Sequence, residues 1–148
     1  MEIEYINEKI IYIKSLLIKL NKLFSKYDNT TNEEEKEFFF AAMTKFVEEI
    51  IEISIKINNK LLEENKDFAG TYYQTFQKLS KYYPIDKENK EYFSNITSLR
   101  NKATHKDENM FENEKENLKK YKNIIKKFPT YIDYIKKIIE NEKNKSDK

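Results

Sequence analysis

The sequence predicts an all-α protein, an up-and-down bundle of four long helices and one short helix. Apolar residues recur every three or four positions along most of the 148 residues, which is the spacing of helices with one buried face. The chain contains one glycine and two prolines, whereas sheets need turn residues at short intervals. One domain over residues 1–141 is expected, followed by a polar C-terminal tail at 142–148.

The first two helices are expected at residues 1–27 and 32–66. Thr31 and Glu34 have the spacing of a capping box, in which two side chains three residues apart bind each other's backbone N–H at a helix start. The residues expected to point inward are Ile3, Ile6, Ile10, Ile13, Leu17, Leu20, Phe24 and Tyr27 in the first helix, and Phe39, Met43, Phe46, Ile50, Ile53, Ile57 and Leu61 in the second.

A short third helix is expected at residues 71–81, where Thr71 and Gln74 repeat the capping-box spacing. Pro84 ends it, because the residue before a proline is pushed out of helical conformation. Asp86 then caps a fourth helix. The residues expected inward are Tyr72, Phe76 and Leu79 in the short helix, and Phe93, Ile96, Leu99 and Ala103 in the fourth.

The last helix is expected to open at Asn109 and Glu112 and to continue through Pro129. A proline lacks the backbone N–H that would bond to Ile125, so the sequence predicts a kink at Pro129 rather than a new element. The residues expected inward are Leu118, Tyr121, Ile125, Phe128, Ile132, Ile135 and Ile139.

Residues 99–105 contain the single arginine and the single histidine of the chain. Arg100 is one of 28 basic residues, the rest of which are lysines, and His105 follows it five residues later. A guanidinium binds phosphate with a planar, permanently charged fork. An imidazole can take and give a proton near neutral pH. Together they provide what the cleavage of a phosphodiester needs in the absence of a metal.

On an unbroken helix Arg100 and His105 would lie about 140° apart around the axis. They converge only if the helix loosens near Thr104, or if two copies meet across a dimer axis. We therefore expect the site at a helix end and at a homodimer interface. The apolar stripes at the two ends of the chain, which offer more surface than one bundle can bury, also indicate a dimer.

The stretch resembles the Arg-x-x-x-x-His motif of HEPN-domain proteins, and in particular the HepT-like toxin subfamily, which typically reads Leu-Arg-Asn-x-x-x-His-x-Tyr. The residues that match in place are Leu99, Arg100, Asn101 and His105. The subfamily's upstream Ser-Tyr-x-x-x-Phe-x-x-Leu is similar to Thr71, Tyr72, Phe76 and Leu79, with threonine for serine. The order of long and short helices also agrees, and the resemblance covers residues 38–139.

The resemblance implies a HEPN-like bundle and a dimeric, metal-independent endoribonuclease. Such proteins are toxic when free and are paired with a nucleotidyltransferase-type antitoxin. His105 would act as general base on a ribose 2′-hydroxyl, Arg100 would hold the phosphate, and Asn101 would orient or support them. No cofactor or metal is implied. RNA would end in a 2′,3′-cyclic phosphate, and DNA would survive because it lacks the 2′-hydroxyl.

One residue departs from the subfamily pattern. The tyrosine two residues after the histidine, which the antitoxin modifies with AMP, is Asp107 here. A carboxylate cannot serve as that phenolic acceptor. Either regulation of this chain uses another route, or another tyrosine is modified, or this member has diverged from the subfamily.

An alternative remains open, in which the chain is a catalytically inactive HEPN scaffold that binds a nucleotide or a nucleotidyltransferase partner. Arg100 and His105 would then be a surface ion pair and an exposed histidine. A group of lysines either lines an RNA path or forms a solvated helix face. These lysines are Lys119, Lys120, Lys122, Lys126 and Lys127.

Composition excludes several other classes of protein. A formal net charge of +2 does not by itself require a polyanionic partner, and one histidine without cysteine argues against a zinc site. The acidic start lacks the pattern of a secretory signal, and no apolar stretch approaches membrane-spanning length. We therefore expect a cytoplasmic protein without a membrane partner, and the absence of cysteine is compatible with a reducing compartment.

Overall fold

A computed structural model describes residues 1–105 and 113–146, with side chains for residues 1–100 and 113–145. This part of the chain contains five helices and no strand. The helices are α1 (Ile3–Asn29), α2 (Glu33–Glu64), α3 (Tyr72–Tyr82), α4 (Lys87–His105) and α6 (Glu114–Ser146). The predicted all-α fold with four long helices and one short helix is confirmed.

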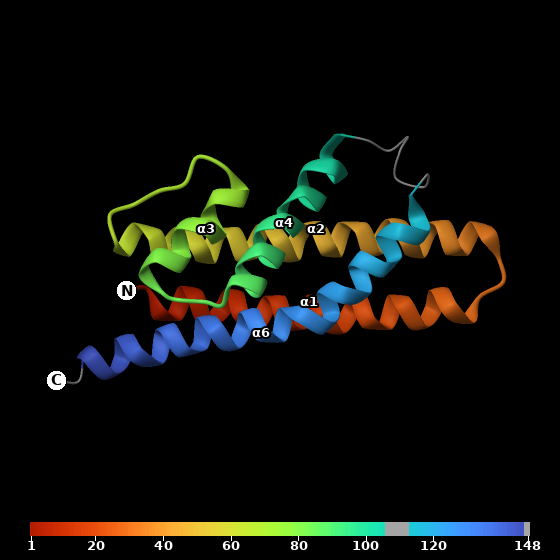
Figure 1. Cartoon of the computed structure of the whole chain (residues 1–148). Coiled ribbons are helices and arrows are strands. Elements are labelled where there is room, and N and C mark those ends of the chain that lie inside the picture. The colour runs from red at the N-terminus through yellow and green to blue at the C-terminus, as the bar shows by residue number, and fades with distance from the viewer. Residues whose placement is uncertain (106–112, 147–148) are drawn as a thin grey trace.

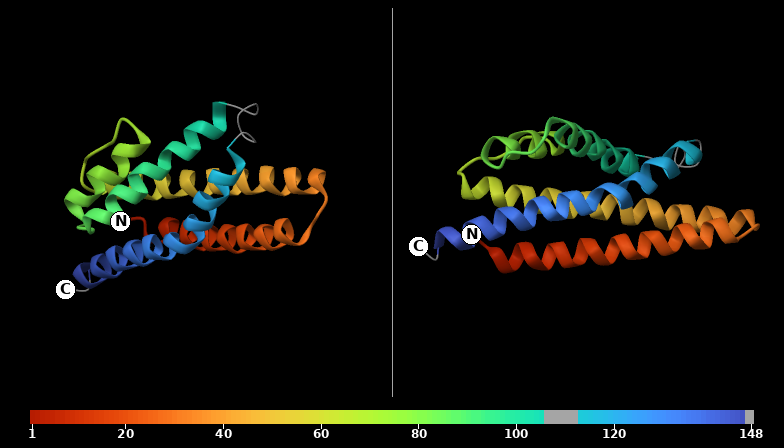
Figure 2. Two further views of the ribbon diagram at one scale, coloured as in Figure 1. Left: turned by 45° about the vertical axis from the view of Figure 1, so that its right-hand side comes forward. Right: turned by 60° about the horizontal axis from the view of Figure 1, so that its bottom comes forward.

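The antiparallel pair of α1 and α2 forms the base of the bundle (Figure 1). α3 and α4 contact each other and pack on α2, while α6 contacts both α1 and α2. Successive long helices reverse direction, so the start of α1 and the end of α6 lie at the same end of the bundle (Figure 2). The end of α4 and the start of α6 lie near each other, away from the chain termini (Figures 1 and 2).

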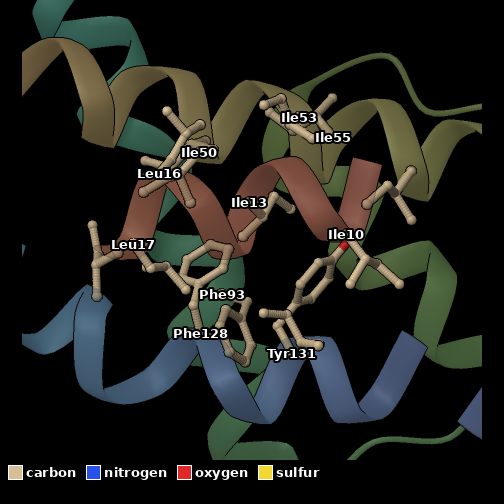
Figure 3. Packing of buried hydrophobic residues seen from close by; sticks show 14 of the residues in the cluster. Ile10, Ile13, Leu16, Leu17, Ile50, Ile53, Ile55, Phe93, Phe128 and Tyr131 are labelled. Carbon is tan, nitrogen blue, oxygen red and sulfur yellow. The ribbon is translucent and has the colours of Figure 1, made fainter. Parts of the chain in front are cut away.

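The core consists of isoleucine, leucine and aromatic side chains from all five helices. Figure 3 shows Phe93 of α4 beside Phe128 and Tyr131 of α6, with Ile13 of α1 and Ile50 of α2 nearby. The Phe93 ring lies 5.5 Å from that of Phe128 and 5.7 Å from that of Tyr131. Burying one such side chain contributes about 1.5–3 kcal/mol. Aromatic packing therefore joins α4 to α6.

Three helices also meet in a buried polar network. The Tyr131 hydroxyl of α6 lies 2.8 Å from Asn58 Oδ1 and 3.0 Å from the Ser54 carbonyl oxygen, both on α2. Asn58 Nδ2 donates to Thr75 Oγ1 of α3 at 3.3 Å. Burial raises the pKa of Tyr131 well above its usual value, so the hydroxyl remains a donor at physiological pH. Each of these polar groups has a partner, which limits the cost of burying them.

The helix starts agree with two of the three predicted caps. Thr71 Oγ1 accepts from the Gln74 backbone N–H at 3.2 Å, and Asp86 Oδ2 accepts from the Asn89 backbone N–H at 3.0 Å. The capping box predicted for Thr31 and Glu34 is wrong by one residue.

In α2 the capping residue is Asn32, whose side chain accepts from the Glu35 backbone N–H at 3.0 Å. Thr30 Oγ1 donates to the Glu35 carboxylate at 2.7 Å. Asparagine is at least as good a cap as threonine. This start also places Glu33, Glu34 and Glu35 in the first turn, where the helix dipole favours negative charge.

Most predicted inward residues are buried or partly buried wherever their side chains are described. Tyr72 is the exception, because its side chain is 37% exposed at the first residue of α3. Thr75 occupies the buried position instead, and its bond to Asn58 turns this side of α3 toward α2. The prediction that Tyr72 points inward is therefore wrong.

The last helix, α6, continues without interruption through Pro129. Figure 1 shows that α6 changes direction along its length, in agreement with the kink predicted for this helix. Pro129 is exposed to solvent, so the backbone hydrogen bond that it cannot donate is lost outside the core.

The observed C-terminal end of α6 differs from the predicted end. The sequence predicts a polar tail from residue 142, whereas the helix continues to Ser146. Lys145 pairs with Glu142 within it (Nζ to Oε1, 3.7 Å). Polar residues one turn apart can extend a helix beyond its last apolar residue. The predicted opening at Asn109 and Glu112 lies outside the described residues.

Candidate functional site

Arg100 lies on the side of α4 that packs against the rest of the bundle. It follows Phe93 by seven residues, about two helical turns, so both side chains lie on nearly the same side of the helix. Phe93 is fully buried, whereas the Arg100 side chain is 18% exposed. The apolar line of α4 therefore ends in a guanidinium at the contact with α2.

Two glutamates of α2 bind this guanidinium. Arg100 Nη1 lies 2.8 Å from Glu48 Oε1, and Nε donates to Glu52 Oε2 at 3.0 Å. We call these three residues the Glu48–Arg100–Glu52 cluster. One positive charge faces two negative charges, and Nη2 has no carboxylate partner among the described residues. The cluster joins α4 to α2 as well as placing Arg100.

Thr44 and Tyr121 extend this polar line by one turn of α2. The two hydroxyl oxygens lie 2.9 Å apart, and both side chains are buried. Burial raises the pKa of Tyr121, and the charge of Glu48 raises it further, so the phenol is neutral at physiological pH. The group that α6 adds to this polar line is therefore an uncharged phenol.

The other two predicted site residues, Asn101 and His105, lie in the last turns of α4. Their side chains lie outside the described residues, and so does Asp107. The α4 backbone is helical through His105, so it does not loosen near Thr104. Arg100 and His105 therefore diverge by about 140° on one helix. Of the two arrangements expected to bring them together, a loosened helix near Thr104 is therefore not seen in the α4 backbone.

No motif in the sequence singles out Glu48 and Glu52. Their signal is that they lie one turn apart on α2, beside the buried residues Val47 and Ile51. An acid this close to a buried face needs a cation from another element, because an unpaired charge there is costly. Arg100 supplies that cation.

The second stretch of the predicted resemblance forms α3. Thr71 caps the helix, Leu79 is buried, and the Phe76 ring stacks on that of Phe93 with centroids 5.8 Å apart. These residues hold α3 against α4. Their contacts therefore position the helix that carries Arg100.

Comparison with known proteins agrees with this arrangement. A family model described as "HepT-like: Ribonuclease HepT-like" matches residues 6–138. The chain belongs to the HepT-like ribonuclease family. A search of curated proteins finds no match. The HepT-like match includes the whole of α2, α3 and α4, and thus both stretches on which the resemblance was based.

Two further properties of this HepT-like chain concern the described residues. Within residues 1–100 and 113–145, no three histidine, aspartate or glutamate side chains come together as a metal site. Each described helix is too short or too polar to cross a lipid bilayer.

Proposed function

We propose that this HepT-like protein is a metal-independent endoribonuclease, the toxin of a pair with a nucleotidyltransferase-type antitoxin. The observation that carries the proposal is the family match over residues 6–138, which includes the helix with Arg100 and His105. The active form is a homodimer in which the two α4 helices face each other.

In this mechanism His105 removes the proton from a ribose 2′-hydroxyl, and the oxygen attacks the adjacent phosphorus. The bond to the 5′-oxygen breaks, and that oxygen takes up a proton from solvent. The products are a 2′,3′-cyclic phosphate and a 5′-hydroxyl. Arg100 stabilises the negative charge that grows on the phosphoryl oxygens, and Asn101 orients the reacting groups.

The Glu48–Arg100–Glu52 cluster determines how a phosphate would reach Arg100. Nε and Nη1 are already held, so a phosphate oxygen binds Nη2 or takes the place of Glu52. Glu52 is the more exposed carboxylate, at 41% against 26% for Glu48. Glu48 then keeps the guanidinium in position while the substrate binds.

A second function is favoured by the same ion pairs. Arg100 forms ion pairs with two carboxylates, and these pairs can join α4 to α2 without any substrate. In that case the chain is a catalytically inactive HEPN scaffold that binds a nucleotide or a nucleotidyltransferase partner.

RNA cleavage in excess EDTA tests the first function. The purified protein should cleave labelled single-stranded RNA, leave 2′,3′-cyclic phosphate ends, and spare DNA of the same sequence. His105→Ala, purified in parallel, controls for contaminating nucleases. Loss of cleavage with EDTA and its return with magnesium would contradict the metal-independent mechanism. A parent protein that cuts no RNA but binds a nucleotidyltransferase would support the scaffold.

A further inference from the structure

Positive charge is concentrated in one part of α6. Residues 115–132 contain six lysines and one glutamate, a net charge of +5, whereas the formal net charge of the whole chain is +2. The remaining residues therefore carry a net charge of −3. The protein therefore has a small net charge although it contains a strongly basic segment, because its other residues are acidic on balance.

Several of these lysines surround one hollow on the surface. It is open to solvent and has a volume of about 390 Å³. It is lined by Lys119, Lys120, Lys122, Asn123 and Lys126, which we call the α6 lysine face. Lys119, Asn123 and Lys126 lie on the side of α6 opposite the buried Tyr121, and Lys120 and Lys122 lie about 100° from it on either flank. The lining contains no acidic side chain.

The charges of this face are largely free to bind an anion. Lys119 and Lys126 have no carboxylate within ion-pair distance among the described residues. Lys122 Nζ lies 5.6 Å from the centroid of the Phe24 ring of α1. This cation–π contact holds the lysine side chain in place but does not neutralise its charge. Lys120 pairs with Glu116 at 3.7 Å, but this pair is exposed and therefore weak.

We propose that the α6 lysine face binds the phosphate backbone of single-stranded RNA. This inference rests on the proposed function, because it gives the substrate a path to the site. α6 begins near the end of α4, so a strand on this face leads toward the helix that carries Arg100 (Figure 2). Lysines spread along about 10 Å of helix can neutralise neighbouring phosphates and release their counterions.

The structure favours a nucleic acid over a membrane as the anionic partner. A helix that lies on a lipid surface inserts large apolar side chains beside its lysines. The large exposed apolar residues of the described chain lie on α1, α2, α3 and the loop before α3, and α6 has none of them. The α6 lysine face therefore offers charge without an apolar anchor.

Two triple variants of the full chain test this proposal. Lys119→Gln, Lys122→Gln and Lys126→Gln remove three charges from the face. Lys136→Gln, Lys137→Gln and Lys143→Gln remove three exposed charges farther along the same helix, so net charge changes equally. Circular dichroism checks that both fold. The probe is a labelled 2′-O-methyl RNA oligonucleotide, which binds through its phosphates but cannot be cleaved through the 2′-oxygen.

The face variant should lose roughly 100-fold in affinity at about 0.1 M salt. The plot of log affinity against log salt concentration should become less steep by about 2. Each phosphate contact on a single strand contributes about 0.7 to the steepness, and the variant lacks three lysines. The control variant should bind within about twofold of the parent.

Equal binding by the two variants would overturn the proposal, as would a parent that does not bind the oligonucleotide. It would also fail if the face variant lost binding to phosphatidylserine vesicles but kept binding to the oligonucleotide. A parent that binds through this face but cleaves no RNA would support this inference and contradict the proposed ribonuclease activity.

Discussion

Arg100 stabilises the fold before any substrate binds. Its side chain is 18% exposed, and its guanidinium contacts two carboxylates of another helix. Removing the cation leaves Glu48 and Glu52 one turn apart with no opposite charge between them, and like charges at that spacing repel each other. Removal of the Arg100 charge therefore affects both stability and any phosphate binding, and the two effects must be separated.

A lysine substitution and an alanine substitution separate them. Arg100→Lys should reduce RNA cleavage nearly as much as His105→Ala, roughly 10²- to 10⁴-fold, because lysine keeps the charge but loses the fork. Arg100→Lys should melt close to the parent. Arg100→Ala should lose about 1–3 kcal/mol of unfolding free energy, between the values for buried and for surface ion pairs.

The measurements are cleavage of a labelled RNA and urea unfolding of the parent and all three variants. If Arg100→Lys cleaves at the parental rate, only the charge of Arg100 matters for catalysis. If Arg100→Ala is as stable as the parent, the cluster makes no net contribution to the fold.

Single residues differ in how far the sequence predicts their roles. The caps at Thr71 and Asp86 are local, since each side chain binds a backbone N–H three residues away. The pairing of Arg100 with Glu52 spans 48 residues and depends on how two helices cross. No local pattern contains that crossing, so the motif could be predicted but its acidic partners could not.

At the scale of helices, the start of α4 depends on a charged cap. The Asn89 backbone N–H, and then the Asn89 side chain, lower the pKa of Asp86 below its usual value. A carboxyl group whose pKa is lower in the folded state stabilises the fold above its unfolded pKa of about 3.9. That stabilisation disappears as the pH falls through the lowered folded value.

Asp86→Ala should therefore melt at a lower temperature than the parent at pH 7, and the difference should shrink at about pH 2.5. Asp86→Asn is the matched control, since asparagine also caps a helix start but does not titrate. Thermal melts by circular dichroism at both pH values measure the effect. A difference that stays constant between the two pH values would show that the charge of Asp86 contributes nothing.

Helix positions are well predicted because each long helix has an apolar stripe, but helix ends are not. The stripe of α6 ends at Ile139, whereas the helix continues to Ser146. Beyond Ile139 the backbone hydrogen bonds and pairs such as Glu142 with Lys145 are enough to continue the helix. A hydrophobic pattern reports where a helix is buried, and not where it stops.

At the scale of the whole molecule, one of the two reasons for expecting a dimer does not hold. The apolar stripes of α1 and α6 are largely buried within one chain. The remaining reason is the divergence of Arg100 and His105 on α4. The large exposed apolar residues of α1 include Ile11 and Ile18, which are 66% and 59% exposed and two turns apart.

Light scattering at micromolar concentration should give twice the 18.0 kDa mass of the chain. A double variant, Ile11→Lys with Ile18→Lys, should keep that mass, because the proposed interface lies at α4. A monomeric parent would contradict the shared active site. If the parent is a dimer and the double variant is a monomer, the interface lies at α1 and not at α4.

The buried hydroxyl of Tyr131 also decides the axial register of the bundle. Isoleucine stripes look alike one turn farther along, so apolar contacts alone would tolerate α6 shifted by about 5.4 Å against α2. In a shifted bundle Tyr131 and Asn58 would both be buried without each other, at about 1–3 kcal/mol for each group left unsatisfied. A single phenol thus selects one alignment among several that hydrophobic packing accepts. The same alignment fixes where the start of α6 lies relative to the end of α4 (Figure 2).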